Sequence, residues 1–276
     1  MPNYITESPP KRKMPAILDQ IVAATKATLP ALRARSSELE RQAAASPEAP
    51  SFAGSLRAGR AVALIAEVKR RSPSAGTIRG DLDPAGHAER YAGAGAAAIS
   101  VLTEGPHFGG SIDDLVAVHA RVSVPVLRKD FIIDELQVVE ARAKGASAIL
   151  LIVRILSPAR LEALLRFARG LGLDMLVETH TQGEIDVALA AGADIVGVNS
   201  RDLDTFALDP AQAWTLLAAV PSGVLAVAES AMHTIEDVRA AARAGADAVL
   251  IGTALSAAGD PAPFIRQIGE VQRRGR

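Results

Sequence analysis

The chain has no cysteine among its 276 residues and few aromatic residues. The absence of cysteine excludes disulfides, thiolate chemistry and cysteine-based metal sites. Two tyrosines, one tryptophan and six phenylalanines are too few for the stacking platforms of single-strand nucleic-acid binders. A formal net charge of −1, from 30 basic and 31 acidic residues, gives no bulk attraction to nucleic acid or to a membrane surface. We therefore expect neither of them as a partner.

Long apolar segments are also missing. No stretch approaches the ~20 apolar residues of a membrane span. The first residues, MPNYITESPPKRKMP, hold no apolar core of a secretory signal. These absences favour a cytoplasmic enzyme. The basic cluster Lys11–Lys13 could be a nucleic-acid arm, but a solvated tail is the simpler interpretation.

The five histidines show neither metal-ligand spacing nor an HExxH motif. We therefore predict that the protein uses no metal. His180, two residues after Glu178, is predicted to be a surface loop residue.

What the sequence does have is a set of four apolar, strand-like runs that each stop on a charged residue. They are Ala61–Lys69, Val124–Lys129, Leu173–Glu178 and Gly223–Glu229. Runs of this composition are typical of strands buried on both faces, as in a parallel sheet covered by helices. Their ends place Lys and Glu together on one rim of the sheet. In an α/β barrel that C-terminal rim carries the active site.

From Ala61 onward, strand patterns alternate with helix patterns. Strands are predicted at residues 62–69, 97–102, 125–129, 147–152, 173–178, 194–199, 224–229 and 247–251. A Gly-Ala pair before an apolar run recurs about every 50 residues, which indicates a repeated unit; it lies at Gly95, Gly145, Gly192 and Gly245. Each of these glycines stands where a helix ends, a position that favours positive φ. Two βα units per repeat predict an α/β fold, a (β/α)8 TIM barrel.

The rest of the chain precedes this barrel. Residues 1–14 are predicted to be a disordered tail, 15–60 a helical extension, and 61–276 the barrel, with extension and barrel forming one catalytic domain. Apolar residues recur with helical spacing over Ala16–Ala45, and Pro30 is expected to break or kink this pattern, giving two helices. Residues 46–59 carry Pro, Ser and Gly and are predicted to be a connector.

Six polar residues end the predicted strands. They are Glu67, Lys69, Lys129, Glu178, Asn199 and Glu229. Glu67 and Lys69 are two apart, so they share a face of their strand at roughly 6–7 Å and follow Ile65 toward the barrel interior. Rim salt bridges are the structural alternative. Convergence of lysines with carboxylates favours a site in which a lysine pKa is tuned for proton transfer.

A second group of residues suggests an anion. Ser72–Gly76 follows the first strand, and Ile251–Thr253 closes the eighth. Barrels of this kind often hold phosphate in loops after the last strands, beside a short helix. Each segment is a weak signal alone, but both fall on one rim. Phe108 and Phe131 follow strands two and three, where an aromatic pocket wall and core packing are equal alternatives.

Several longer segments resemble the indole-3-glycerol phosphate synthase family. They are IAEVKRRSPSAGTI (65–78), SVLTEGPHFGGSIDDL (100–115), PVLRKDFIIDELQVVEARAKGASAILLI (125–152), LVETH (176–180) and GVNSRDLDTF (197–206). The resemblance runs from about residue 15 to 265. It implies a decarboxylating, dehydrating ring closure of 1-(2-carboxyphenylamino)-1-deoxyribulose 5-phosphate to indole-3-glycerol phosphate in tryptophan biosynthesis, with no cofactor. The phosphorylated substrate is the expected partner.

The resemblance also implies roles by position. Lys129 matches the general acid on the ribulose carbonyl, and Glu178 matches the carboxylate that moves protons in the later steps. Lys69, with Glu67 beside it, matches a lysine that contacts substrate and supplies the dehydration proton. Asn199 and Glu229 match residues that orient the ring and hydroxyls.

The binding residues follow in the same way. Arg201 matches a structural or substrate-orienting residue of the rim, and Phe108 and Phe131 match the anthranilate side. The phosphate cradle is implied at Ser72, Ser230, Ala231, Gly252 and Thr253. Where the family usually has Glu-Ser-Gly-Ile, this chain has Glu-Ser-Ala-Met at 229–232, so a positive φ at Ala231 would be strained. Arg71 and Ala75 also depart from the usual Ala and Lys.

Two other functions are weighed against the cyclisation. One is an aldolase-like phosphosugar barrel with Lys129 as a Schiff-base nucleophile, which borohydride trapping would detect. The other is a non-catalytic paralogue that binds phosphorylated ligands, against which the retention of all the charged rim residues argues. We expect a monomer or a weak homo-oligomer.

Overall fold

The computed structural model describes residues 16–202 and 207–275, so the tail predicted at 1–14 lies outside the described residues. A parallel sheet closes on itself in the order β1-β10-β9-β8-β7-β6-β5-β4, with β4 pairing back to β1. Its strands are β1 (Ala63–Val68), β4 (Ala98–Leu102), β5 (Val126–Lys129), β6 (Ala148–Ile152), β7 (Asp174–Thr179), β8 (Ile195–Asn199), β9 (Leu225–Glu229) and β10 (Ala248–Ile251). Each overlaps a predicted strand, so the (β/α)8 barrel is confirmed.

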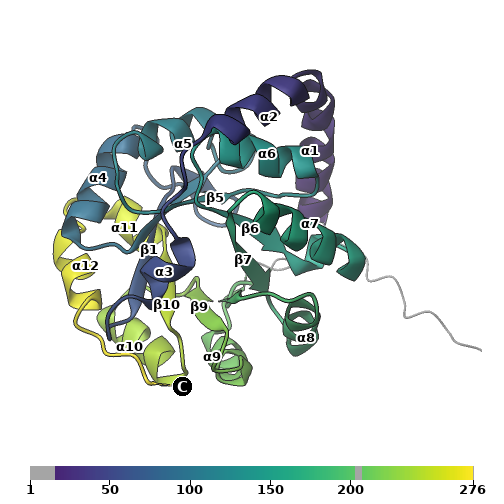
Figure 1. Cartoon of the computed structure of the whole chain (residues 1–276). Helices are drawn as coiled ribbons and strands as arrows, with labels where there is room; N and C mark the ends of the chain where they lie inside the picture. The colour runs from purple at the N-terminus through teal and green to yellow at the C-terminus, as the bar shows by residue number, and fades with distance from the viewer. Residues whose placement is uncertain (1–15, 203–206, 276) are drawn as a thin grey trace, which may run out of the picture.

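Helices form a ring around this barrel (Figure 1). They are α4 (Pro84–Ala94), α5 (Ile112–His119), α6 (Glu135–Ala143), α7 (Pro158–Gly170), α8 (Gln182–Ala190), α9 (Pro210–Ala219), α10 (Ile235–Arg243) and α12 (Ala262–Ile268). Two shorter pieces, η1 (Val153–Ile155) and α11 (Thr253–Ala257), follow β6 and β10. A side-chain oxygen caps the first turn of most of the ring helices, at Asp83, Ser111, Asp134, Ser157, Thr181, Asp209 and Thr234. Each such cap contributes about 1 kcal/mol and fixes where its helix begins.

The glycines of the predicted repeat end helices as expected. Gly95, Gly145, Gly192 and Gly245 have φ values of 112°, 88°, 84° and 104°. A residue with a Cβ is strained in this left-handed region, whereas glycine is not. The four glycines therefore let the chain turn from α4, α6, α8 and α10 into the next barrel strand.

Alternate residues of each strand face different apolar layers. On β1, Leu64, Ala66 and Val68 belong to the layer shared with the surrounding helices. Ala63 and Ile65 belong to the layer inside the barrel. Glu67 continues the inward series, so its carboxyl lies at the upper end of the barrel interior, as the strand pattern predicts.

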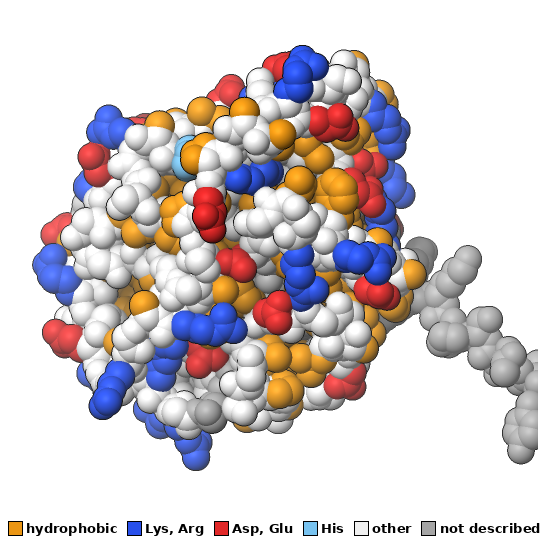
Figure 2. Space-filling view, viewed as in Figure 1, with side chains coloured by type: hydrophobic (Ala, Val, Ile, Leu, Met, Phe, Trp, Pro, Cys, Tyr) orange, Lys and Arg blue, Asp and Glu red, His pale blue; other side chains and the backbone are white. Residues whose placement is uncertain are grey.

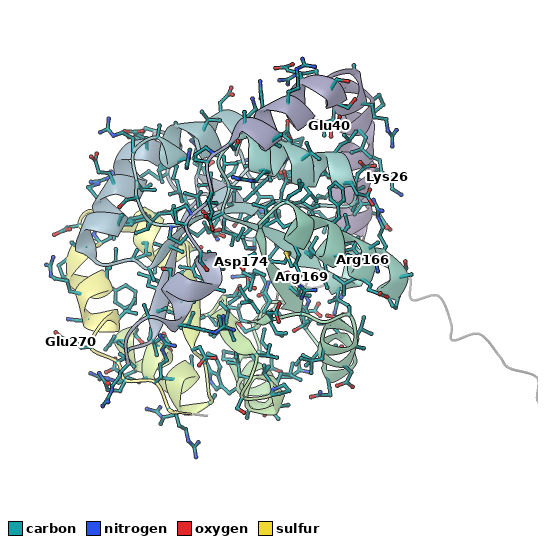
Figure 3. The ribbon with its side chains drawn as sticks, viewed as in Figure 1. Lys26, Glu40, Arg166, Arg169, Asp174 and Glu270 are labelled. Carbon is teal, nitrogen blue, oxygen red and sulfur yellow. The ribbon has the colours of Figure 1, made fainter. Side chains whose placement is uncertain are left out.

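The connector predicted at residues 46–59 is wrong in part, because it contains helix α3 (Phe52–Arg57). This helix lies across the N-terminal end of the barrel, where Figure 3 shows Asp174 beside it. The Ala53 amide donates to Asp174 Oδ2 at 2.8 Å, and the Ser55 hydroxyl donates to the Ala97 carbonyl. Phe52 is fully buried. The helix therefore closes this end and leaves the opposite end of the strands for a site. A single six-residue segment among Pro and Ser gave too little periodicity to predict it.

The break predicted at Pro30 is also wrong. Helix α1 (Ala16–Ala34) continues through Pro30, and the chain breaks instead at Arg35, before α2 (Ser36–Ala45). Leu29 and Leu32 are buried on either side of Pro30, whereas Pro30 itself is exposed. Burial of the two leucines offsets the ~3 kcal/mol that an interior proline costs a helix.

The surface shows no concentration of one charge. On the face seen in Figure 2, acidic and basic side chains are interspersed rather than gathered in one basic patch. Within the described ranges, no helix is long and apolar enough to cross a membrane.

The extension shares a core with the barrel helices. Leu29, Leu32 and Leu39 form one apolar cluster with Val139 of α6. That the extension and the barrel act as one domain stays a prediction.

Replacing Leu39, which is fully buried, tests this prediction. We expect Leu39→Ala to lower the free energy of unfolding by about 2–4 kcal/mol through the cavity that it leaves. The single tryptophan is Trp214 on α9, remote in sequence from α2. If the extension and the barrel form one cooperative domain, Leu39→Ala lowers the urea midpoint of the Trp214 fluorescence and that of the far-UV circular dichroism by the same amount. Glu40→Ala, an exposed neighbour (Figure 3), is the control. If the urea midpoint of the Trp214 fluorescence is unchanged in Leu39→Ala, the extension and the barrel unfold as two separate units.

Candidate active site

A cavity of about 1040 Å³, including its open mouth, lies at the C-terminal ends of the barrel strands. It is in the size range of small-molecule sites. All the candidate residues from the sequence line it: Glu67, Lys69, Ser72, Phe108, Lys129, Phe131, Glu178, Asn199, Arg201, Glu229, Ser230, Ala231, Gly252 and Thr253. The barrel therefore brings together residues that are far apart in the chain. What each of them does stays a prediction.

The charged residues form three ion pairs, and Lys129 belongs to two of them. Lys69 Nζ lies 2.7 Å from Glu67 Oε1. Lys129 Nζ lies 3.4 Å from Glu178 Oε2 and 3.8 Å from Glu229 Oε2. The three glutamate side chains are at most 3% exposed, whereas both lysine side chains are 17% exposed. The carboxyls thus form the floor of the cavity, and the ammonium groups stand above them, within reach of a ligand.

Lys129 is held in its charged form. Burial by itself lowers the pKa of this lysine, but the negative charges of Glu178, Glu229 and Glu67 together outweigh burial and raise the pKa above its ordinary value. An ammonium in a water-poor pocket is a strong electrostatic group, because little solvent screens it. Lys129 is therefore a charged proton donor rather than a free amine.

The pKa values of Glu178 and Glu229 are shifted in opposite directions although both carboxyls face Lys129. Burial raises the pKa of Glu178, but Lys129, His180 and the Asn199 amide overcome it and lower the pKa below its ordinary value. For Glu229, burial and the neighbouring Glu178 charge raise the pKa well above that value. Like-charged carboxyls this close do not both ionise readily. Of the two carboxyls beside Lys129, Glu178 therefore stays ionised more readily and Glu229 holds a proton more readily, a pattern that separates base from acid.

Glu67 is ionised by its partners. Burial raises its pKa, but the charges of Lys69 and Lys129 lower it below the ordinary value. Gly252 makes room for this pair, because a Cβ there would lie 2.3 Å from Glu67 Oε1 and 3.0 Å from Lys69 Nζ. Gly197 does the same for the other carboxyl, since its Cβ would lie 2.1 Å from Glu229 Oε1. Both glycines are needed for space, and sequence analysis missed the role of Gly197.

Asn199 connects two parts of the rim. Its Oδ1 accepts a hydrogen bond from the Arg201 amide at 3.0 Å. With the oxygen occupied, the amide nitrogen is the group that donates to Glu178. Arg201 pairs with Leu208 in an isolated β-bridge and borders the cavity.

The loops after β9 and β10 line the wall beside these carboxyls. Ser230 and Ala231 both have left-handed backbone, with φ of 66° and 55°. The strain anticipated for alanine at position 231 is therefore present.

The segment after β1 also borders the cavity. It forms a small hairpin that was not predicted, in which β2 (Arg71–Ser72) pairs with β3 (Gly76–Thr77). Its turn is closed by the Ala75 amide, which donates to Ser72 Oγ at 3.2 Å.

Two phenylalanines form an apolar wall. The rings of Phe108 and Phe131 lie 6.1 Å apart between centroids and are tilted by 37°. Phe131 is buried and Phe108 partly buried in the cluster that fills the barrel interior. Both alternatives from the sequence hold, since the rings belong to the core and also border the cavity.

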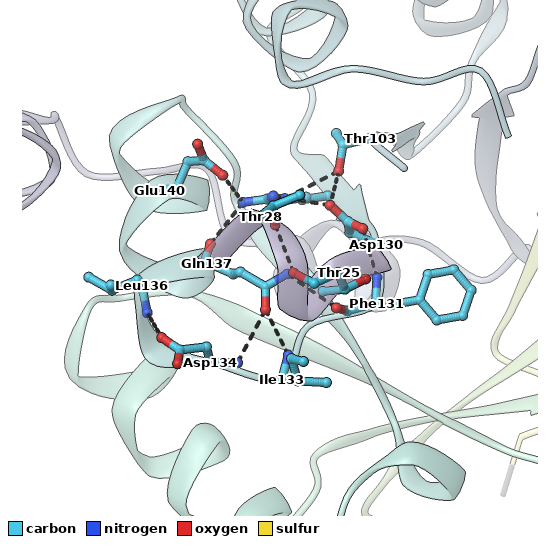
Figure 4. A network of polar contacts seen from close by, with 11 residues as sticks. Thr25, Thr28, Thr103, Asp130, Phe131, Ile133, Asp134, Leu136, Gln137 and Glu140 are labelled. Atoms are coloured by element: carbon cyan, nitrogen blue, oxygen red, sulfur yellow. Dashed lines mark hydrogen bonds and ion pairs between the residues drawn. The ribbon is translucent and has the colours of Figure 1, made fainter. Parts of the chain in front are cut away.

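A buried network fixes the strand end that carries Lys129 (Figure 4). Arg128, on the opposite face of β5, donates to Thr103 Oγ1 at 3.2 Å and to Asp130 Oδ2 at 3.0 Å. It also pairs with Glu140 Oε2 at 3.0 Å. These partners satisfy a charge that would otherwise be costly to bury. Through these contacts, Arg128 and Asp130 hold the backbone in place on both sides of Lys129.

His180 is the clearest correction. It was predicted to lie on a surface loop, but it is only 7% exposed and faces Glu178. The strand β7 extends one residue further than predicted, to Thr179, so His180 directly follows the strand end. The two-residue spacing from Glu178 was the signal that could have found it, because such residues share a face.

The sequence of this cavity's scaffold matches known proteins. The family model described as "Indole-3-glycerol phosphate synthase" matches residues 18–268. An "Indole-3-glycerol phosphate synthase 2" of Streptomyces coelicolor is 48% identical over 255 residues, covering 92% of this chain and 98% of the relative. An "Indole-3-glycerol phosphate synthase" of Chlorobium phaeovibrioides is 50% identical over 210 residues, covering 76% of this chain and 81% of the relative.

More distant structures share the fold alone. A 3-hexulose-6-phosphate synthase from Salmonella typhimurium superposes with a TM-score of 0.62 at 17% identity, over 76% of this chain and 97% of the other. A thiamine phosphate pyrophosphorylase from Pyrococcus furiosus gives 0.58 at 15% identity, over 76% and 94%. The family match and the close relatives, rather than the fold, decide the assignment. The chain belongs to the indole-3-glycerol phosphate synthase family.

Proposed function

We propose that this cavity carries out the family's ring closure, with Lys129 as the acid that starts it. The reaction converts 1-(2-carboxyphenylamino)-1-deoxyribulose 5-phosphate to indole-3-glycerol phosphate, carbon dioxide and water. The observation that carries the proposal is the Lys129 ammonium, 3.4 Å from Glu178 and 3.8 Å from Glu229 at the centre of the cavity floor. The protein's own side chains supply every proton donor and acceptor that the reaction needs.

Ring closure places negative charge on an oxygen. The anthranilate carbon that bears the carboxylate attacks the ketone carbon, and the carbonyl π electrons move to the oxygen. Lys129 donates a hydrogen bond to that oxygen as the charge grows, which is where preorganised electrostatic stabilisation acts most strongly. Because the pKa of Lys129 is raised, its proton transfers late, when the oxygen has become a strongly basic alkoxide. The new carbon–carbon bond and a hydroxyl group result.

The later steps need a base and a second acid. Loss of carbon dioxide returns its electron pair to the ring and restores aromaticity. The hydroxyl then leaves as water with a proton from Lys69, which Glu67 holds at 2.7 Å. Glu178, ionised beside Lys129 and Asn199, takes the proton from the adjacent carbon, and the indole double bond forms. Glu229, whose raised pKa lets it hold a proton more readily, donates to a substrate hydroxyl and, with Asn199, orients it.

The two ends of the substrate have different surroundings. Phe108 and Phe131 give the anthranilate ring an apolar wall. At the other end, the phosphate is assigned to the groups that line the cavity after β1, β9 and β10: Ser72, Ser230, Ala231, Gly252 and Thr253. Hydroxyls and backbone amides of such loops are the usual partners of a phosphate in barrel enzymes. Arg201, at the rim, is assigned to orienting the substrate.

The aldolase-like alternative is less favoured. A Schiff base forms only from a neutral amine, and Lys129 is held as an ammonium by three carboxyls. The binding-only paralogue has no use for two lysines paired with buried glutamates.

We also propose a cytoplasmic enzyme that is a monomer or weak homo-oligomer. In support, the large apolar side chains exposed among the described residues, Val116, Phe167 and Leu208, lie on three separate segments.

Removing the ammonium tests the proposal. We expect Lys129→Ala to lose at least about 10³-fold in kcat, because both the proton and the charge are lost. Product is measured by indole fluorescence with EDTA present, and a phosphate-bearing inhibitor should still bind. Lys26→Ala, on the exposed face of α1 (Figure 3), is the matched control. Near-normal kcat in Lys129→Ala would reject Lys129 as the acid, and borohydride inactivation in the presence of substrate would favour the aldolase.

The strained alanine gives a second test. Ala231→Gly should raise the free energy of unfolding by about 0.5–1 kcal/mol, because glycine adopts positive φ without a Cβ clash. It should also lower KM about twofold at unchanged kcat, the signature of better ground-state binding. Ala44→Gly, exposed in α2, is the control and should destabilise by about 0.5–1 kcal/mol. An unchanged KM would remove the Ala231 backbone from the phosphate cradle.

A further inference from the structure

His180 is a buried group that the mechanism above does not use. Its side chain is 4% exposed, and its Nε2 lies 3.5 Å from Glu178 Oε1. Within the described residues, this buried nitrogen has no hydrogen-bond partner of good geometry. A polar atom in that situation is costly unless a nearby charge or a bound group compensates. Among the described residues, the group that faces this nitrogen is the Glu178 carboxylate, which is assigned the base role.

The other edge of the imidazole is fixed by a second carboxylate. His180 Nδ1 lies 3.3 Å from Glu184 Oε2, and the same oxygen accepts a hydrogen bond from the His180 amide at 2.7 Å. Glu184 belongs to the first turn of α8, and its Oε1 pairs with Arg154 Nε of η1 at 3.1 Å. Burial raises the pKa of Glu184, but His180 and Arg154 overcome it and lower the pKa. Glu184 therefore orients the ring and aims Nε2 at Glu178.

We infer that His180 is a positioning residue for Glu178: held from behind by Glu184, its imidazole keeps the Glu178 carboxylate ionised and directed across the cavity toward Lys129. This inference rests on the base role proposed for Glu178. The two carboxylate oxygens divide their contacts, since Oε1 faces His180 and Oε2 faces Lys129. A carboxylate held at both oxygens has one orientation, which is what a base must keep while the substrate reacts.

The charges around Glu178 set the direction of the effect. Lys129 and His180 favour its ionised form, and Asn199 donates to it, whereas Glu67 and Glu229 face it from the other strands. A base acts only above its own pKa. Without His180, burial and the other glutamates raise the pKa of Glu178, so activity must be lost first at low pH and return as the pH rises.

The test compares pH profiles of kcat in two variants. His180→Asn keeps an amide near Glu184 but leaves the place opposite Glu178 empty, whereas the longer side chain of His180→Gln can place an N–H donor there. We expect His180→Asn to lose about 10- to 100-fold in kcat at pH 6, with its acidic limb moved up by about one pH unit or more. The loss should shrink to within about threefold at high pH, with little change in KM. His180→Gln should shift less.

Three comparisons decide the outcome. His119→Asn, an exposed histidine on α5, should keep the parent profile. A folded His180→Asn whose acidic limb does not move overturns the inference, because a merely structural residue lowers kcat at all pH values alike. If His180→Asn does not fold, the acidic limb of the kcat profile is measured in Glu184→Gln instead. This variant keeps His180 but removes the carboxylate that holds its ring in place. Product formation by the parent chain, lost in Lys129→Ala, shows separately whether the proposed function stands.

Discussion

The structure of this site depends on one partly buried ammonium, that of Lys129, among three buried carboxyl groups. Lys129 is charged because Glu178, Glu229 and Glu67 surround it. Charges largely removed from water are tolerated only when they are paired. Two lysines face three glutamates on the cavity floor, and burial together with the neighbouring Glu178 charge raises the pKa of Glu229 well above its ordinary value. The pKa of Glu178, which also faces Lys129, is lowered. The charge balance of the floor thus sets Glu178 apart as the carboxyl that stays ionised more readily and Glu229 as the one that holds a proton more readily.

The barrel geometry makes this cluster from residues far apart in sequence. The interior of such a barrel is filled in layers of four side chains drawn from alternate strands. Here the top layer comes from β1, β5, β7 and β9, and it consists of Glu67, Lys129, Glu178 and Glu229. Gly197 of β8 and Gly252, which follows β10, leave the room that the side chains of Glu229 and Glu67 need. Helix α3 closes the far end, so the charged layer opens in one direction only.

The sequence was sufficient for the fold and for most of the lining of the cavity, because buried strands and their charged ends leave a strong local pattern. It was insufficient where a tertiary contact decides. Pro30 stays inside a helix because neighbouring leucines are buried, and no local rule weighs that burial. The roles of Gly197 and Gly252 depend on where a glutamate from another strand ends. His180 was misplaced because its partner Glu184 enters from the following helix.

The most direct test of the account is the protonation of the three floor glutamates in the resting protein. Carbon-13 NMR of glutamate-labelled protein resolves neutral from ionised carboxyls, and Glu229→Gln and Glu178→Gln assign the signals. The account predicts that, as the pH is lowered, the first of the three carboxyls to become neutral is the one whose signal is absent from Glu229→Gln, while Glu178 stays ionised to lower pH. A first neutral signal that is instead absent from Glu178→Gln, or three carboxyls that become neutral together, would contradict it.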